Sequence, residues 1–311
     1  MKIAHLSDLH FTNFFRKNNL EKIEYLLKYA LRHDFDHLII SGDLTHNADP
    51  EDFEILRNLF KKYDLLRSDR LSLVIGNHDI FGGPQTAEDV FLFPEKCKIV
   101  DYDKKIKEFG DYFSESFQYC SDINGDNYFP YIKKFHDVII FGLNSIAKYS
   151  KMNNPFASNG KIYEDDYNFL ATNLEKYYIE KAKKLIVIHH HFNKIKVVKN
   201  KSVSSFWQNV EKQTMKLKKK KKLFQLFNLY KVDLVLHGHI HESNEYFRKG
   251  IRFLNAGASV LGAVPEELKI NFINVQSSGI DTEIHKILYN DVIIPEVKHE
   301  ESENRIFSIV K

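Results

Sequence analysis

Aspartate, asparagine and histidine residues gather at five places in the sequence, each directly after a short apolar run. The segments read SDLH, SGDL, GNHD, HHH and GHIH, and their polar residues include Asp8, His10, Asp43, Asn77, His78, Asp79, His189, His239 and His241. A single aspartate or histidine after a strand is usually a cap or a turn residue. Five such clusters instead favour one shared site, because a sheet brings the ends of its strands to a common edge.

Two carboxylates, one amide oxygen and several imidazoles form a mixed nitrogen and oxygen ligand set without thiolate. Such a set suits Mn²⁺, Fe, Zn²⁺ or Co²⁺ better than Ca²⁺ or a structural zinc site. It is larger than one ion needs, and it suffices for two ions if one carboxylate bridges them. Two metal ions on the order of 3.5–4 Å apart commonly promote in-line displacement at phosphorus. The residue types alone therefore favour phosphoester hydrolysis.

The apolar runs before the first three clusters alternate with helical patterns. Strand-like runs cover residues 2–7, 37–41 and 71–75. Between them, residues 20–31 have helical spacing, and Asp49-Pro50 provides an N-cap and a first-turn proline for a helix through residue 60. This alternation predicts an α/β sheet with its active site at the carboxyl ends of the strands.

The pattern is looser over residues 82–131, an aromatic and charged stretch that we interpret as an inserted cap or long loop. Strand patterns resume at 136–145, at 185–188 and at 233–237, with a helix near 165–178. One domain over residues 1–295 accommodates all of these elements.

The part of the chain after Gly250 has strand-like pieces separated by glycine and serine turns, and the last of them lies near residues 287–294. We predict that these pieces supply a second sheet. Residues 296–311 are charged and are expected to form a solvated tail.

Composition limits the class of protein and its compartment. The chain has 311 residues and a formal net charge of +3, which gives no global electrostatic case for nucleic acid or an anionic membrane. Its two cysteines, Cys97 and Cys120, form no CxxC pair, and the first strand begins too early for a signal peptide. No apolar run approaches the roughly 20 residues that cross a bilayer. The cytoplasm is the predicted location, while peripheral membrane contact and oligomeric state stay open.

The order of the five clusters resembles that of a known family. DxH at Asp8, GD at Asp43, GNHD around Asn77, a histidine after a strand at His189, and GHxH at His239 are similar to the calcineurin-like metallophosphoesterase superfamily. The resemblance runs from residue 3 to about residue 260, and within the superfamily it points to the bacterial branch of the class III cyclic nucleotide phosphodiesterases. It implies a four-layer αββα sandwich, in which two mixed β-sheets are flanked by helices.

The resemblance also implies a role for each matching residue. One metal ion would be held by Asp8, His10 and His241, the other by Asn77, His189 and His239, with Asp43 bridging the two. His78 would hydrogen-bond the phosphate and assist the leaving oxygen, or it would only orient Asn77. A metal-bound hydroxide, its pKa lowered toward neutrality, would attack phosphorus.

The three consecutive histidines should differ in role. Successive side chains of an extended segment point to opposite faces, so His190 should face away from the metal that His189 binds. His191 returns to the metal side, where it would contact substrate or line the rim. His46 and Asn47, just after Asp43, are close enough in sequence to touch substrate, although turn polarity explains them equally well.

Other polar and aromatic residues have simpler explanations. His5 and His237 lie inside strand patterns and are predicted to be buried and hydrogen-bonded. The lysine-rich run 215–227 reads as a helix with a solvated face, and its alternative is a surface for a polyanionic substrate, a lipid headgroup or DNA. Phe206 and Trp207 would line a substrate pocket or simply pack.

Three functions are compatible with these residues. The leading one is a dinuclear phosphodiesterase for a cyclic nucleotide, a nucleotide-linked molecule or another small phosphodiester. A nuclease or phosphomonoesterase of the same superfamily is the second, and a non-catalytic scaffold with this fold is the third. The intact ligand set argues against the scaffold.

Overall fold

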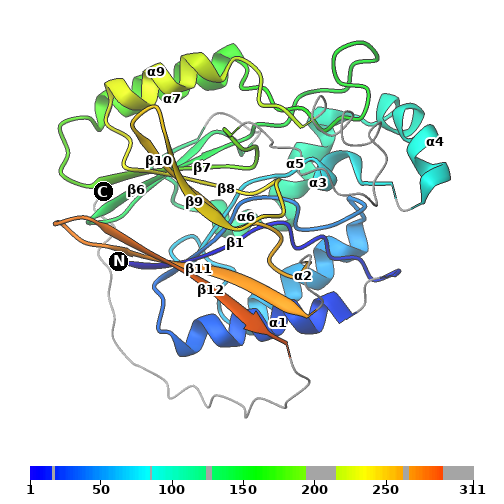
Figure 1. Cartoon of the computed structure of the whole chain (residues 1–311), viewed down its shortest axis with the longest axis horizontal. Helices are drawn as coiled ribbons and strands as arrows, with labels where there is room; N and C mark the ends of the chain where they lie inside the picture. Colours follow the sequence, from blue (N-terminus) through cyan, green and yellow to red (C-terminus); the bar gives the residue numbers. More distant parts are fainter. Residues whose placement is uncertain (16–17, 85, 124–127, 194–214, 262–265, 290–311) are drawn as a thin grey trace.

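The computed structural model describes residues 1–15, 18–84, 86–123, 128–193, 215–261 and 266–289. Phe206, Trp207 and the charged tail 296–311 lie outside these ranges. Over the described ranges the chain forms two mixed β-sheets flanked by helices, as predicted (Figure 1).

The first sheet has the strand order β12-β11-β1-β2-β3. Its parallel part consists of β1 (Lys2–Leu6), β2 (His37–Ile40) and β3 (Leu71–Leu73). On the other edge of β1, β11 (Glu267–Val275) pairs antiparallel and β12 (Ile280–Leu288) continues the sheet. Every residue of β2 and β3 is buried, as expected for parallel strands covered on both faces.

The second sheet has the strand order β4-β5-β6-β7-β8-β10-β9. Its parallel centre is β6 (Val138–Leu143), β7 (Lys183–Ile188), β8 (Leu234–His237) and β10 (Ile251–Asn255). The antiparallel strands β4 (Asp122–Ile123), β5 (Tyr131–Lys134) and β9 (Asn244–Arg248) complete its two sides.

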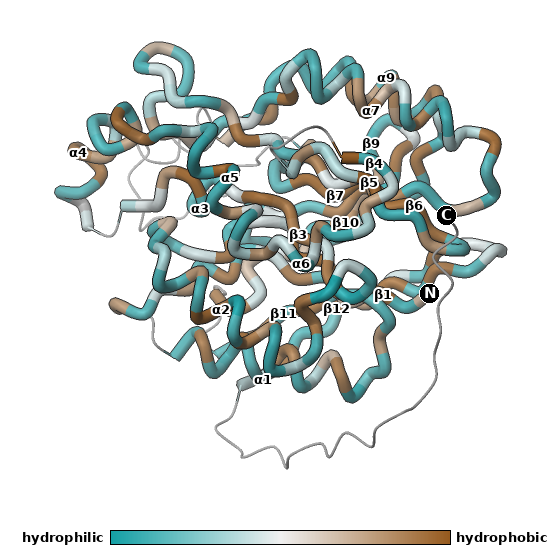
Figure 2. Tube along the Cα trace, turned by 180° about the vertical axis from the view of Figure 1, so that it is seen from behind, coloured by the Kyte–Doolittle hydropathy of each residue, from teal (hydrophilic) through white to brown (hydrophobic). Residues whose placement is uncertain are grey.

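Helices cover the outer face of each sheet and complete the four layers (Figure 1). α1 (Asn18–Arg32) and α2 (Pro50–Lys62) lie against the first sheet, whereas α7 (Glu164–Lys176) and α9 (Lys220–Leu229) lie against the second. Figure 2 shows hydrophobic and hydrophilic residues alternating along α1, whose buried side chains include Ile23, Leu26, Leu27 and Ala30. The Asp49 side chain accepts from the Glu51 amide and caps α2.

The strands near the end of the described chain correct the sequence prediction. They do not form a second sheet of their own: β11 and β12 join the first sheet, and β9 and β10 join the second. The reason is that β1 has a free edge opposite β2, and β11 satisfies its backbone groups there. The last described strand ends at Leu288, and most of the run predicted near residues 287–294 lies outside the described residues.

The segment 82–131 contains more regular structure than a long loop. It holds α4 (Ala87–Lys98), α5 (Tyr102–Tyr112) and the short α6 (Ser114–Phe117), just after the short α3 (His78–Phe81). The aromatic side chains that obscured its pattern, among them Phe109 and Phe113, are buried in the main core. Much of this segment therefore packs as part of the domain. Within the described ranges, every helix is too short or too polar to cross a membrane.

Candidate metal centre

The predicted site residues come together where the carboxyl ends of the two sheets meet. Asp8 and His10 follow β1, Asp43 follows β2, and Asn77 and His78 follow β3, all in the first sheet. The second sheet contributes His189 after β7, and His239 and His241 after β8. The two halves touch, because the His239 amide donates to the Asp8 carboxylate at 2.9 Å.

Several of these residues adopt a left-handed backbone conformation. The φ angles are 50° at Asp8, 43° at His10, 51° at Asp43 and 68° at His239. This region is uncommon for residues other than glycine and costs on the order of 1 kcal/mol or more each. Four such residues in one cluster indicate that the loops are shaped to aim side chains rather than to relax the backbone.

The first group of side chains consists of Asp8, His10 and His241. The Nε2 atoms of His10 and His241 are 3.1 Å apart, and each lies 3.8 Å from Oδ1 of Asp8. His10 and Asp8 are buried, whereas the His241 side chain is 53% exposed. This group matches the set predicted for one metal ion, with an opening toward solvent on the His241 side.

The second group consists of Asn77, His189 and His239. Nε2 of His189 lies 3.3 Å from Oδ1 of Asn77 and 3.1 Å from Nδ1 of His239. All three residues are buried. This group matches the set predicted for the other ion.

Asp43 lies between the two groups. Its Oδ2 is 3.7 Å from Nε2 of His10 and 3.4 Å from Nε2 of His189. Its Oδ1 accepts a hydrogen bond from the His78 amide at 2.8 Å, which fixes the orientation of the carboxylate. One oxygen therefore faces both groups, as a bridging ligand would.

The hydrogen bonds of His189 fit a cation. Nδ1 of His189 lies 2.9 Å from the carbonyl of Ser41 and can only donate to it. In the neutral ring Nε2 is then an acceptor, and it faces Oδ1 of Asn77, Oδ2 of Asp43 and a nitrogen of His239. Converging lone pairs of this kind repel one another unless a cation, either a proton or a metal ion, lies between them, so the donor set fits a metal site.

The electrostatics of the buried groups lead to the same conclusion. Burial disfavours the charged form of His189, but the Asp43 carboxylate outweighs it and raises the pKa of His189 to about 9. Burial raises the pKa of Asp8 to about 7, and burial lowers the pKa values of His10 and His239 well below the usual range. A positive charge near Asp43 is therefore stabilised by the cluster, and the neutral rings of His10 and His239 have lone pairs that can bind a metal ion.

Packing around His189 leaves no room for a larger residue at Gly42. A Cβ atom there would lie 2.5 Å from Nδ1 of His189, and Gly42 has a φ of +99° that favours glycine. The glycine of the GD motif therefore allows the second strand to approach the ring that the seventh strand supplies.

His78 and His46 form a third group with His10, and their ring nitrogens lie within 4.8 Å of one another. Nδ1 of His78 lies 3.0 Å from the carbonyl of His46 and donates to it, which leaves Nε2 of a neutral His78 ring as an acceptor. The His46 and His78 rings are 4.9 Å apart, centroid to centroid. The structure thus brings His46 beside the candidate catalytic histidine, a grouping that the sequence did not indicate.

Asp79 has a positioning role that sequence reasoning missed. Its carboxylate accepts hydrogen bonds from the amides of Gly76, Leu44 and Thr45, and so ties the GD loop to the GNHD loop. Burial, reinforced by Asp43, raises the pKa of Asp79 to about 7 despite these donors. An acid at the end of GNHD could have suggested such a tie, but two of its three partners, Leu44 and Thr45, lie more than 30 residues earlier.

The three consecutive histidines divide largely as predicted. His190 is turned away from Asp43, and its two ring nitrogens lie 2.8 Å from the Ser145 hydroxyl and 3.2 Å from the Ser158 carbonyl. His191 was expected at the rim, but it is only 1% exposed, and its ring stacks against that of His239 at 5.8 Å. Burial lowers the pKa of His191 to about 2, so this ring is a neutral packing partner of His239.

His5 and His237 are buried and hydrogen-bonded, as predicted. Nε2 of His5 is 2.9 Å from the Ser41 hydroxyl, and Nε2 of His237 is 2.8 Å from the Tyr246 hydroxyl. Asn47 is partly buried beside His46.

The fold and the clustered nitrogen and oxygen donors define a metal-binding α/β protein with its site between two sheets. Residues 1–243 match the family model of the calcineurin-like phosphoesterases, and the chain belongs to this family, whose members depend on two metal ions. A probable cyclic nucleotide phosphodiesterase of Ruthia magnifica subsp. Calyptogena magnifica is 22% identical over 260 residues, or 82% of this chain and 85% of the relative.

Two solved structures have a similar fold at low sequence identity. A dimetal phosphatase from Danio rerio superposes with a TM-score of 0.59 and 13% identity, covering 93% of this chain and 99% of its own. A purple acid phosphatase from yellow lupin (Lupinus luteus) gives a TM-score of 0.57 and 12% identity, covering 93% of this chain and 52% of its own. These likenesses concern the fold alone.

Proposed function

We propose that this protein hydrolyses a small phosphodiester at the site around Asp43. The observation that carries the proposal is that Oδ2 of Asp43 faces both His10 and His189, at 3.7 and 3.4 Å. Asp8, His10 and His241 would hold one metal ion, Asn77, His189 and His239 the other, and Asp43 would bridge them. Two bound ions would activate water and neutralise charge that develops at phosphorus.

His78 is the proposed catalytic residue. Its amide holds Asp43, and its Nδ1 is fixed by the His46 carbonyl, so the other ring nitrogen is the one free to meet the substrate. With a proton on both ring nitrogens, Nε2 would donate a hydrogen bond to a phosphoryl oxygen and then give its proton to the departing oxygen. His46, whose ring centroid lies 4.9 Å from that of His78, is a proposed substrate contact, with Asn47 as a weaker proposal.

The preference for a diester rests on the relative that is named as a probable cyclic nucleotide phosphodiesterase. The candidate substrates are therefore a cyclic nucleotide, a nucleotide-linked molecule or another small phosphodiester. Segment 82–131 is the proposed cap that would select among them, because α3 leads into it directly from His78. Manganese, iron, zinc and cobalt are all compatible with the nitrogen and oxygen donors.

The cytoplasm is the proposed compartment. Cys97 and Cys120 are both free thiols, and burial raises the pKa of Cys97 to about 12. A pair of unlinked, unreactive cysteines is typical of a reducing environment.

The test is a comparison of two aryl phosphates. The purified protein is reconstituted with Mn²⁺, Fe²⁺, Co²⁺ or Zn²⁺ and assayed with bis(4-nitrophenyl) phosphate and with 4-nitrophenyl phosphate, with Asn77→Ala and His78→Ala as controls. Preference for the diester, lost in both variants, is the expected result. Preference for the monoester would overturn the diesterase assignment, and the absence of turnover with every metal would favour a non-catalytic scaffold.

A further inference from the structure

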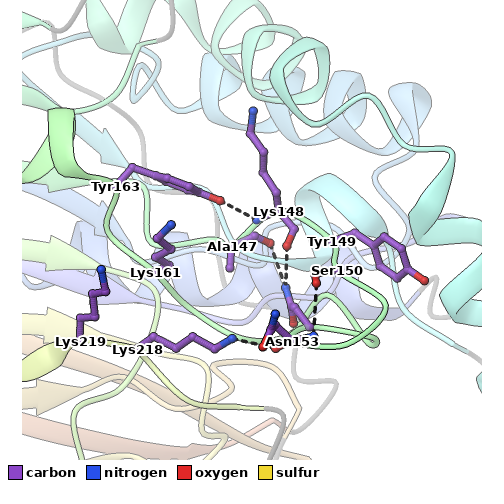
Figure 3. Close-up of a pocket in the computed structure, with 10 residues that line it drawn as sticks. Ala147, Lys148, Tyr149, Ser150, Asn153, Lys161, Tyr163, Lys218 and Lys219 are labelled. Atoms are coloured by element: carbon purple, nitrogen blue, oxygen red, sulfur yellow. Dashed lines mark hydrogen bonds between the residues drawn. The ribbon is translucent and has the colours of Figure 1, made fainter.

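A cavity lies at the same edge of the second sheet as the metal centre. It has a volume of about 400 Å³ and lies beside the loop that follows β6 (Figure 3). The described residues that line it include no acidic residue but four lysines, Lys148, Lys161, Lys218 and Lys219. An excess of positive charge around a cavity of this size is suited to a small anion with several charges.

The lysines come from two segments that are held in place by the backbone. The Gly160 amide donates to the carbonyl of Lys216 at 2.9 Å, and the Gly160 carbonyl accepts from the amide of Lys218 at 2.8 Å. The short bridge between Gly160 and Leu217 thus sets Lys161 beside Lys218 and Lys219. The convergence of these side chains is a property of the fold rather than of flexible side chains that meet by chance.

The opposite wall is also fixed. Asn154 is buried, and its side chain donates to the carbonyls of Ala147 and Lys148, which folds the loop back on itself. The Lys218 ammonium donates to the carbonyl of Asn153 at 2.8 Å and so spans the two walls (Figure 3). An anion that enters this cavity would meet a preformed site.

Within the described ranges three of the four lysines have no acidic partner, and one of these, Lys218, donates to a backbone carbonyl. Lys148 pairs with Asp103 at 2.7 Å. Lys161 lies over the ring of Tyr163 at 4.2 Å, and within the described ranges neither Lys161 nor Lys219 has a salt bridge. Their ammonium groups are therefore available to a ligand.

The positive charge at the start of α9 does not stabilise this helix. Five consecutive lysines, residues 218–222, surround its N-terminus, and its first turn contains no acid. Cations at this end of a helix are disfavoured by the helix dipole, and Lys219 also has a left-handed φ of 55° without a side-chain cap. A bound anion would reverse this unfavourable arrangement, because it would interact well with both the lysines and the helix end.

We propose that the cavity lined by Lys148, Lys161, Lys218 and Lys219 binds a phosphate or pyrophosphate group. Gly160, next to the lining residue Lys161, packs closely against His190, since a Cβ there would lie 2.6 Å from its ring, and His190 follows the proposed metal ligand His189 in the chain. The phosphate group has two possible sources, which are a second phosphate of the hydrolysed molecule and a separate phosphorylated ligand. Both present the same chemistry to the lysines.

The first experiment measures binding of inorganic pyrophosphate to the metal-loaded protein by calorimetry. We expect one site at the metal centre and one in the cavity for the wild type. In Lys161→Met/Lys219→Met the cavity site should weaken by at least tenfold, and wild-type binding should fall steeply with salt. The matched control is Lys181→Met/Lys231→Met, because both lysines are exposed and lie before β7 and β8, at the opposite edge of the sheet. Equal pyrophosphate binding by the two double variants would overturn the proposal.

The second experiment identifies the source of the phosphate. The 4-nitrophenyl ester of thymidine 5′-phosphate is compared with its 3′-phosphorylated form. A drop of at least tenfold in kcat/KM for the 3′-phosphorylated ester alone, in Lys161→Met/Lys219→Met, would assign the cavity to the substrate. Unchanged kinetics together with lost pyrophosphate binding would assign it to a separate ligand. The binding experiment needs no turnover, so it tests the cavity even if the proposed phosphodiesterase activity fails.

Discussion

Nε2 of His189 lies 3.4 Å from Oδ2 of Asp43, although the two residues come from different sheets. His189 thus links the second sheet to the first by two contacts, since its Nδ1 also donates to the Ser41 carbonyl just before the GD loop. Because Asp43 and His189 belong to different sheets, a metal ion bound by both would also hold the two sheets in position. Loss of either residue should therefore affect both metal content and the packing of the sheets at this edge.

We expect Asp43→Asn to lose both metal ions. The amide keeps the shape of the side chain but removes the negative charge that both ligand groups face. The matched control is His190→Gln, because His190 is equally buried yet bonds to Ser145 and Ser158 instead. Metal content per chain after gel filtration, measured by elemental analysis, should approach zero for Asp43→Asn and remain at two for His190→Gln. Metal loss in the His190 variant alone would mean that the register of the three histidines is wrong.

A second prediction separates catalysis from metal binding at His78. His78→Gln should lower kcat/KM for an aryl phosphodiester by roughly 10²–10⁴-fold, the usual range for a lost general acid. Its metal content should stay at the wild-type level, because no proposed ligand is removed. Steady-state kinetics and elemental analysis on the same preparation provide both readouts. Loss of metal in proportion to activity would instead assign His78 the role of orienting Asn77.

The site was predictable from the sequence because each ligand is local to a strand end. Asp8, Asp43 and Asn77 follow strands whose apolar runs are unmistakable, and parallel strands in one sheet must end at one edge. The family resemblance selected His189 as the ligand, and side-chain alternation then placed His190 on the opposite face. No knowledge of distant contacts was needed for these assignments.

The parts that were missed depend on contacts between distant residues. The strand pattern of β11 is clear, but nothing local says that it pairs with β1, more than 260 residues earlier. Asp79 likewise gains its role from the amides of Leu44 and Thr45. α5 did carry a local signal, since Tyr102, Ile106 and Phe109 have helical spacing, but the many surrounding aromatics concealed it.

Asp79 leads to a prediction about stability. Asp79→Ala would leave the buried amides of Gly76, Leu44 and Thr45 without their acceptor, at roughly 1–3 kcal/mol for each unsatisfied group. Asp79→Asn retains one oxygen and should cost less. Urea denaturation of the protein after EDTA treatment measures both effects without a contribution from metal. An Asp79→Ala variant as stable as the wild type would contradict the positioning role.

His37 provides a test of pH dependence away from the metal centre. It is fully buried at the start of β2, where Nδ1 donates to the Asp69 carbonyl and Nε2 lies 2.8 Å from the Ser72 hydroxyl. Burial, reinforced by the Lys133 ammonium, lowers the pKa of His37 to about 3. The folded protein therefore keeps this ring neutral at pH values where the unfolded chain, with a pKa near 6.5, binds a proton.

The sign of the effect follows from that difference. The stabilisation from His37 is fully present above pH 6.5 and is lost as the pH falls toward 3, at about 1.4 kcal/mol per pH unit. In His37→Asn the free energy of unfolding should thus fall less steeply between pH 6 and 4. The difference in slope should be about 1.4 kcal/mol per pH unit, the value for one proton. Urea denaturation of EDTA-treated protein at several pH values measures the slope, with His136→Asn, at an exposed histidine, as the control for the substitution itself. A constant stability difference between wild type and His37→Asn across this range would mean that the buried ring takes up its proton as readily as the unfolded chain.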